Sequence, residues 1–303
     1  MLNKVIASSS LLILFFGSVL HAKDSNTVLQ NSALDIGLTA LYLKTYSESL
    51  PTNSVNSHSS EFERVNTSFE GPWDWAGILE GSYHFMDRAD LILNWMYYSV
   101  DYNGTDLINH IGGDNPRQDI SRNSGKLKIN SVNAEAGQSF DVSAKGTARL
   151  SGGVQYLNIK DKLSNSEVNS VGELPTLIND SYQGLGPRVG LDANYKLKGN
   201  FAVFANSAAT ILLARHKQST SSRQSSSPSS PSTFRSSHRD ITIPELEVKL
   251  GISVNKPIQH GVVSLAAGWT AINYFNLLAQ QLNTSDKNNL TLSGPFLQGK
   301  WVG

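Results

Sequence analysis

The chain has 303 residues with 25 basic and 25 acidic side chains, so its zero formal net charge argues against nucleic acid as a partner. It contains no cysteine, which excludes disulfide bonds, thiolate metal sites and cysteine nucleophiles. The length suits one large β domain, because β-barrels often exceed the usual domain size.

The first residues follow the pattern of an export signal. Lys4 supplies a positive charge, Val5 to Leu20 is an uncharged apolar run, and Ala22 is small enough for a cleavage site. We therefore predict a signal peptide over residues 1–22 and a mature barrel domain over residues 23–303. A retained membrane anchor is the less favoured alternative, because the run is at the short end for spanning a bilayer.

Further along the chain, apolar and polar residues alternate with a period of two, which is the geometry of a β-strand. In chain order the ten predicted strands are Leu34–Lys44, Trp73–Phe85, Asp90–Val100, Leu127–Phe140, Gly146–Ile159, Leu185–Leu197, Phe201–Ala214, Pro244–Val254, Gly261–Phe275 and Leu290–Val302. A soluble β-sandwich is the alternative, but its strands usually run only about five or six residues.

The predicted connections alternate between short turns and long loops. The short links are 87–89, 141–145, 198–200 and 255–260, and the long ones are 45–72, 101–126, 160–184, 215–243 and 276–289. Barrels of bacterial outer membranes have short periplasmic turns and long extracellular loops. We therefore predict an all-β fold, a transmembrane antiparallel up-and-down β-barrel of about ten strands within a range of eight to twelve. Lipid offers the backbone no hydrogen-bond partner, so the sheet must close.

If the apolar faces meet lipid, the polar faces line the barrel interior. The candidate lumen-lining residues are Glu80, His84, Asn94, Glu135, Arg149, Gln155, Arg188, Asp192, Lys196, Glu245, Glu247 and Lys249. Ten strands enclose a small cross-section. These charges either pair with one another, as buried charges must, or line an open polar path that selects solutes.

Aromatic residues stand near several strand ends. The candidate interface aromatics are Trp73, Trp75, Trp95, Tyr97, Tyr195, Trp269 and Trp301. Trp and Tyr anchor barrels at the headgroup boundary, because one part of each side chain is apolar and another forms hydrogen bonds. Each aromatic taken alone could equally fill an ordinary core.

One predicted loop, residues 215–240, is rich in serine and basic residues. Its basic side chains are Arg215, Lys217, Arg223, Arg235 and Arg239. The favoured interpretation is a mobile, solvated extracellular loop. The alternative is an electrostatic contact with lipopolysaccharide phosphates or host-surface polyanions.

Catalytic patterns are weak in this sequence. His84 and Glu80 share one strand face, but a lone histidine beside an acid is more often a structural hydrogen bond than a catalytic pair. No histidine pair shows metal-ligand spacing, and no glycine-rich turn leads into a helix that could bind phosphate. We therefore predict no catalytic residue, no metal, no cofactor and no enzymatic activity.

Several segments together resemble the Legionella-type major outer membrane protein family. The matching stretches are Trp73 to Tyr97, Ser131 to Val142, Gly186 to Leu213, Pro244 to Val254 and Gly268 to Leu278. The resemblance implies an outer-membrane address and pore formation, with cell-surface adhesion as a further theme. The chain departs from disulfide-linked members, because it has no cysteine, and it ends in Trp301, Val302 and Gly303 instead of a terminal aromatic residue.

The sequence thus predicts a porin-like protein with a narrow pore for small solutes or ions. The alternative is a non-conducting surface adhesin or structural protein that works through its long loops. The expected partners are outer-membrane lipid and lipopolysaccharide, the barrel assembly machinery and host-surface ligands. A homo-oligomer without disulfide links is a further option.

Overall fold

The computed structural model describes residues 33–47, 62–63, 69–86, 88–110, 117–169, 172–223, 232–259, 261–277 and 289–303. The predicted signal peptide, residues 1–22, lies outside the described residues. Within them, no helix has both the length and the apolar character needed to cross a membrane.

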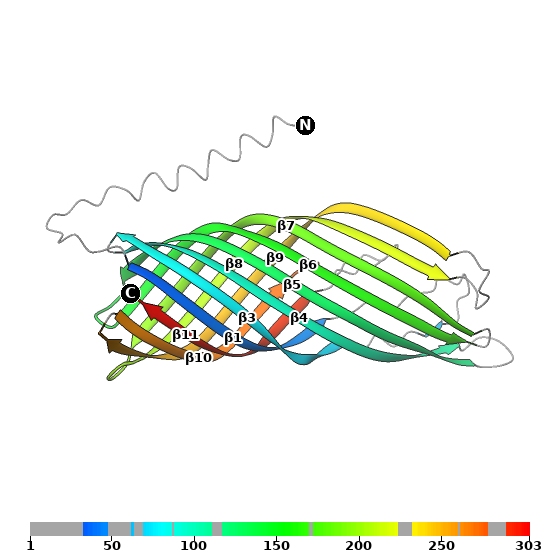
Figure 1. The fold of residues 1–303 in the computed structure, drawn as a ribbon, viewed down its shortest axis with the longest axis horizontal. Helices are drawn as coiled ribbons and strands as arrows, with labels where there is room; N and C mark the ends of the chain where they lie inside the picture. The colour runs from blue at the N-terminus through cyan, green and yellow to red at the C-terminus, as the bar shows by residue number, and fades with distance from the viewer. Residues whose placement is uncertain are drawn as a thin grey trace, which may run out of the picture. The chain divides into compact units, whose positions relative to one another are not determined.

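Ten long strands form the fold, which confirms the predicted number (Figure 1). They are β1 (Ala33–Ser47), β3 (Phe69–Met86), β4 (Ala89–His110), β5 (Arg117–Asp141), β6 (Gly146–Asn169), β7 (Gly172–Lys196), β8 (Phe201–Arg223), β9 (Ser232–Ile258), β10 (Gly261–Tyr274) and β11 (Leu290–Val302). A two-residue strand, β2 (Phe62–Glu63), pairs only with the end of β4.

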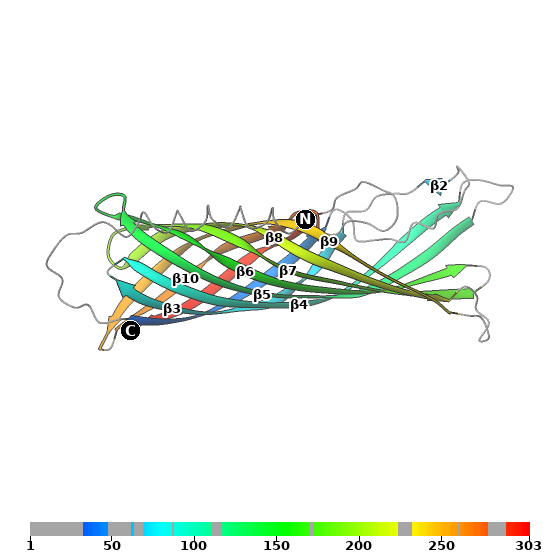
Figure 2. The ribbon, with the colours of Figure 1, turned by 90° about the horizontal axis from the view of Figure 1, so that it is seen from above.

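The six strands β4–β9 extend beyond their predicted bounds at the end where long loops were expected (Figure 2). At the other end β9 continues to Ile258, so the predicted short link 255–260 is wrong over 255–258, which pair with β10. The predicted loops 101–126, 160–184 and 215–243 are wrong over most of their length, because paired strands occupy them. Their Ser and Asn content is typical of loops, yet backbone pairing between strands requires no apolar side chain. We call this the long-loop end and the opposite end the short-turn end.

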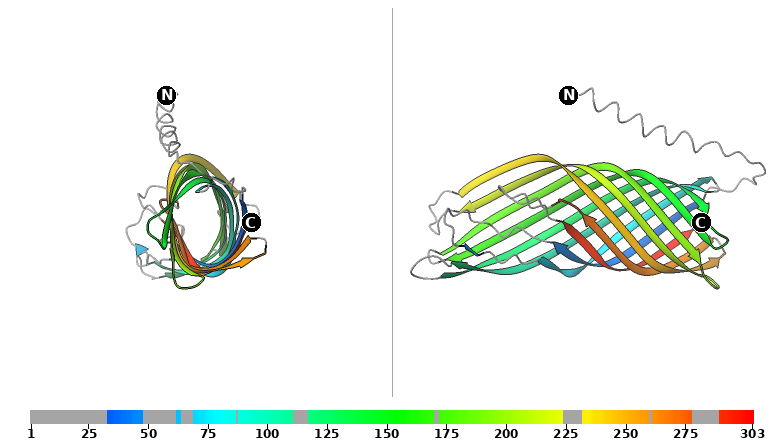
Figure 3. Two further views of the ribbon diagram at one scale, coloured as in Figure 1. Left: turned by 90° about the vertical axis from the view of Figure 1, so that its left-hand side faces the viewer. Right: turned by 180° about the vertical axis from the view of Figure 1, so that it is seen from behind.

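Every strand pairs antiparallel with its neighbours, and β1 pairs with β11 to close the barrel. Seen along its length, the sheet encircles a central space (Figure 3). Closure gives the backbone of both terminal strands a partner, as lipid requires. The closed antiparallel barrel predicted from sequence is therefore confirmed.

The polarity of the alternation inverts along β4–β9. Around Val132 and Tyr156, apolar side chains point outward, and Tyr156 is 42% exposed. Two rows further toward the long-loop end, Lys128 points outward while Ile129 is buried inside. Apolar outside suits lipid, and polar outside suits water. We call the strand ends beyond this change of polarity the collar: residues 99–110, 117–130, 158–169, 172–183, 215–223 and 232–241.

Candidate functional site

The barrel interior contains a polar chamber of about 430 Å³ in its short-turn half. Ten of the twelve predicted lumen residues line it, namely Glu80, His84, Asn94, Glu135, Arg149, Arg188, Asp192, Glu245, Glu247 and Lys249. They come from β3–β7 and β9, whose inward positions share one face because side chains alternate along a strand.

Arg188 is the centre of the largest ion-pair network in the chamber. Its Nε donates to Glu135 Oε1 at 2.7 Å, and its Nη2 donates to Glu247 Oε2 at 2.6 Å. Glu245 Oε1 lies 3.5 Å from Nη1, and Gln155 donates to the other Glu245 oxygen at 2.7 Å. The Arg188 side chain is only 5% exposed, so these partners replace water around the guanidinium.

Two further cations hold carboxylates in pairs. Arg149 binds Asp90 through Nη2 at 2.6 Å and Asp192 through Nη1 at 2.9 Å. Lys300 Nζ lies 3.1 Å from carboxylate oxygens of both Asp35 and Glu80. The interior charges therefore pair mainly with one another, which is the first of the two interpretations left open by the sequence.

Two of the twelve predicted lumen residues differ from expectation. Gln155 is inside the barrel and 1% exposed, but it belongs to the Arg188 network and does not line the chamber. Lys196 is exposed at the short-turn end of β7 and does not line the chamber. It shares the inward face, but the strand ends there and its side chain reaches solvent.

The predicted set of lumen residues did not include Asp35, Asp90 and Lys300, which complete the ion pairs of the chamber. All three lie within predicted strands, and their positions in the alternation could have identified them. His84 Nε2 contacts Asp35 Oδ2 at 2.9 Å, whereas Glu80 pairs with Lys300. The structure thus does not form the His84–Glu80 pair.

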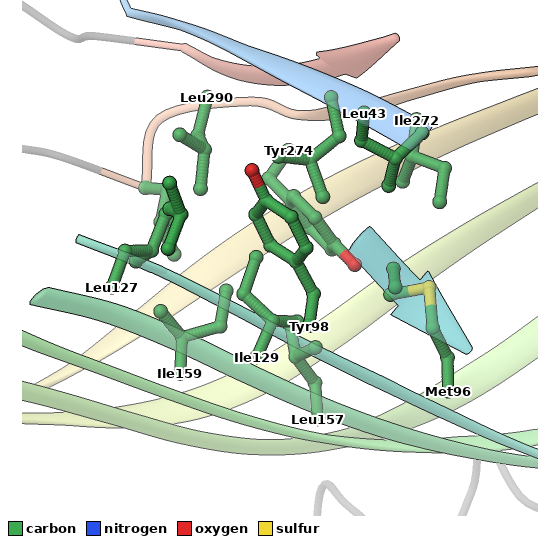
Figure 4. Packing of buried hydrophobic residues seen from close by; sticks show 14 of the residues in the cluster. Leu43, Met96, Tyr98, Leu127, Ile129, Leu157, Ile159, Ile272, Tyr274 and Leu290 are labelled. Carbon is green, nitrogen blue, oxygen red and sulfur yellow. The ribbon is translucent and has the colours of Figure 1, made fainter. Parts of the chain in front are cut away.

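Above the chamber, toward the long-loop end, lies an apolar layer. Its twelve side chains form one packed cluster in which none is more than 3% exposed: Leu41, Leu43, Tyr98, Ile129, Leu157, Ile159, Leu212, Ile243, Ile272, Tyr274, Leu290 and Leu292. Figure 4 shows the rings of Tyr98 and Tyr274 among aliphatic side chains from several strands. Tyr98 shares a hydrogen bond of 2.8 Å with Thr45. The layer packs inside the barrel between the chamber and the level at which the collar begins.

The collar encloses a buried cluster that the sequence interpretation assigned to loops. Tyr102 donates to Asp161 Oδ1 at 2.7 Å, and His216 Nε2 lies 2.8 Å from Asp180 Oδ1. The ring of Tyr182 stacks on His216 with 4.3 Å between the ring centroids. Burial raises the pKa of the Asp161 carboxyl to about 6, and it also raises the pKa of Tyr102.

All seven predicted interface aromatics point outward, with exposed fractions from 37% for Trp301 to 65% for Trp75. Toward the long-loop end, Tyr42 stacks on Trp73 with 5.2 Å between centroids, and Trp269 donates to Ser293 at 2.8 Å. Exposed aromatic rings that cluster at one level are typical of a membrane interface.

The basic segment predicted as a mobile loop is instead a β-hairpin. Arg215, Lys217 and Arg223 lie in β8, whereas Arg235 and Arg239 lie in β9. The two arms pair without interruption, so the loop prediction is wrong over 215–223 and 232–240. Residues 224–231 lie outside the described part of the chain.

A family model described as the Legionella pneumophila major outer membrane protein precursor matches residues 28–303. The chain belongs to this family. The closed barrel, whose side chains around Val132 and Tyr156 are apolar and point outward, agrees with that assignment. The chain is therefore a bacterial outer-membrane protein. No curated protein matches its sequence.

Solved outer-membrane barrels are similar to it at low identity. The outer membrane protease OmpT from Escherichia coli is 12% identical, with 92% of this chain and 98% of that chain covered and a TM-score of 0.49. A major outer membrane protein from Thermus thermophilus is 10% identical, with 90% and 100% covered and a TM-score of 0.40. The translocator domain of NalP from Neisseria meningitidis is 11% identical, with 99% and 97% covered and a TM-score of 0.38.

The first of these structures corrects one prediction. The sequence predicted that the chain is not an enzyme, yet a protease is among the barrels similar to it. That exclusion is overturned. Likeness at 12% identity transfers no catalytic residue and no activity to this chain.

Proposed function

We propose that the protein is an outer-membrane surface protein whose barrel is closed to solutes and whose working parts lie at its long-loop end. The observation that carries this proposal is the apolar layer. A polar solute or hydrated ion would have to displace fully buried side chains such as Tyr98, Ile159 and Tyr274 to cross it. Desolvating an ion in such surroundings is costly.

The ion pairs of the chamber support the same function. Arg188 on β7 binds carboxylates on β5 and β9, and Arg149 on β6 binds carboxylates on β4 and β7, so each arginine ties three strands of the wall together. A rigid, filled barrel is a suitable anchor for the collar and for the segments that join its strands.

Conductance across a planar lipid bilayer tests the proposal. We expect no discrete current steps from the pure folded protein. We expect steps from the double variant Tyr98→Ala with Tyr274→Ala, because it removes the two largest side chains of the apolar layer. Tyr83→Ala with Tyr97→Ala is the matched control, since both tyrosines are exposed on the outer face. Steps from the native protein would contradict the proposal.

A narrow porin-like channel for small solutes or ions is the second candidate, and the polar chamber favours it. The chamber region holds seven carboxylates, Asp35, Glu80, Asp90, Glu135, Asp192, Glu245 and Glu247, against the four cations Arg149, Arg188, Lys249 and Lys300. Seven against four leaves an excess of three negative charges. If the apolar layer opens, the channel should conduct cations better than anions. A reversal potential in a salt gradient that shows anion preference would count against this candidate.

The remaining expectations stay part of the proposal. They are removal of residues 1–22 on export, insertion by the barrel assembly machinery, contact with lipopolysaccharide, adhesion to host-surface ligands, and a homo-oligomer without disulfide links. The apolar side chains that point outward around Val132 and Tyr156 support the lipid contact.

A further inference from the structure

Four lysines form a compact patch on the outer face at the base of the collar. Lys128 on β5 lies directly opposite Lys160 on β6, and Lys126 lies directly opposite Lys162. Their neighbours Leu127, Ile129, Ile159 and Asp161 are buried inside, so all four lysines point outward. We call Lys126, Lys128, Lys160 and Lys162 the lysine patch.

Such pairing is unfavourable unless something else compensates the charge. Directly opposed residues on antiparallel strands have Cβ atoms about 5 Å apart, and like charges there repel. Lys126 contacts Asp101 at 3.0 Å. In the part of the chain that the structure describes, the other three lysines form no ion pair. Four positive charges and one negative charge leave an excess of three.

The two described rows that contain the four lysines supply no further acid on the outer face, and Asp240 in the next row is paired with Arg215. The row through Lys128 and Lys160 continues to Ser99 on one side and to Ser181 and then Lys217 on the other. The row through Lys126 and Lys162 continues to Asn179. The hydroxyl and amide side chains of these neighbours are suited to hydrogen bonds with the oxygens of an anion.

The position of the lysine patch along the membrane normal indicates which kind of anion would bind there. The nearest apolar row on the same strands contains Val132 and Tyr156, four residues from Lys128 and Lys160. Four residues of a strand span about 13 Å, or roughly 9 Å along the membrane normal at a tilt near 45°. Lysine stems lie along apolar surface while the ammonium group reaches the headgroups. Acyl chains against Val132 and Tyr156 would thus bring their headgroup phosphates to the lysine patch.

We propose that the lysine patch binds the phosphate groups of lipid headgroups in the outer leaflet. The site is built by two strands whose register fixes four ammonium groups around one location. A phosphorylated glycolipid carries the charge that the patch lacks and the acyl chains that the adjoining apolar band accepts.

Thermal unfolding of the full-length mature protein in neutral detergent tests this site. We expect added lipopolysaccharide to raise the Tm of the native protein by about 5 °C, because a ligand of the folded state stabilises it. The variant Lys128→Ser with Lys160→Ser should lose more than half of that shift. Without lipid its Tm should equal or exceed the native value, because the repulsion is relieved. Lys145→Ser with Lys198→Ser, at the exposed short-turn end, should behave as the native protein.

Two further probes separate the sources of phosphate. Dephosphorylated lipopolysaccharide should give less than half of the native shift, and inorganic phosphate at millimolar concentration should give almost none. The proposal is overturned if the double variant keeps the full shift, if the native protein shows no shift, or if the dephosphorylated lipid is equally effective. A full shift with inorganic phosphate alone would show a free-anion site instead of a lipid site.

Discussion

At the scale of single residues, the interior is organised by a few cations that each hold several acids. Arg188 contacts Glu135, Glu245 and Glu247. Among the described residues, Lys249 has a long contact of 3.5 Å with Gln298 and lies 4.3 Å from the Phe296 ring centroid. We therefore expect these two basic residues of one chamber to contribute very differently to stability.

Replacing Arg188 with Met should lower the free energy of unfolding by about 3 to 5 kcal/mol, because it leaves buried carboxylates without a partner. Lys249→Met should cost only about 1 kcal/mol, the value of a cation–π contact. Urea unfolding in lipid vesicles measures both. Equal losses would contradict the network described for Arg188.

The free energy of unfolding should depend on pH through Asp161 in the collar. Its pKa of about 6 lies above the ordinary value of 3.8, so the folded state favours the protonated carboxyl. The stability from this group is fully present below about pH 4 and is lost as the pH rises through about 6. Asp161→Asn should remove that pH dependence and be more stable than the native protein above about pH 6, by on the order of 2 to 3 kcal/mol.

Unfolding measured from about pH 4 to about pH 8 checks this expectation as the difference between native protein and variant. Asp240→Asn is the control, because the Asp240 side chain is 84% exposed. A constant difference between native protein and Asp161→Asn across the range would show that Asp161 does not titrate with a raised pKa.

At the scale of elements, the ten strands could be predicted because each membrane-crossing segment places apolar residues on one face. The collar could not be predicted on that criterion, since most of the outer residues described at its base are polar and its sequence is rich in Ser and Asn. A signal was present in residues 126–130, where lysines alternate with Leu127 and Ile129. This alternation has the same period of two as the membrane-crossing strands, but its polar residues point outward and its apolar residues inward. That arrangement is typical of a strand whose outer face meets water.

The closing pair of strands depends on one glycine. A Cβ at Gly294 of β11 would overlap the carbonyl oxygen of Tyr42 on β1, a closeness that real side chains do not show. Gly294→Ala should therefore separate the strands locally and reduce the folded fraction after refolding.

Heat-modifiable migration on a detergent gel measures that fraction. Gly81→Ala is the matched control on the adjacent strand β3, because a Cβ there meets nothing within 4 Å. Equal folded fractions for the two variants would show that the closing pair tolerates a wider spacing.

At the scale of the whole molecule, sequence patterns predicted that polar and charged residues line the barrel interior. They did not predict that the polar chamber is followed by an apolar layer along the barrel axis. Ten of the twelve predicted lumen residues line the chamber, because the inward face follows from alternation alone. The apolar layer was missed, since inward Leu and Ile residues such as Leu157 and Leu212 lie next to outward apolar neighbours and give no polar contrast. Only the register between strands brings these residues to one level.

The collar places the end of β6 far from the membrane. From Tyr156 to Asn169, β6 runs 13 residues beyond the last outward aromatic ring of that strand. At about 3.3 Å per residue and a tilt near 45°, its tip stands roughly 30 Å above the hydrocarbon edge. That elevation exceeds the thickness of a headgroup layer, so we expect a large soluble molecule to reach the tip without contacting the bilayer surface.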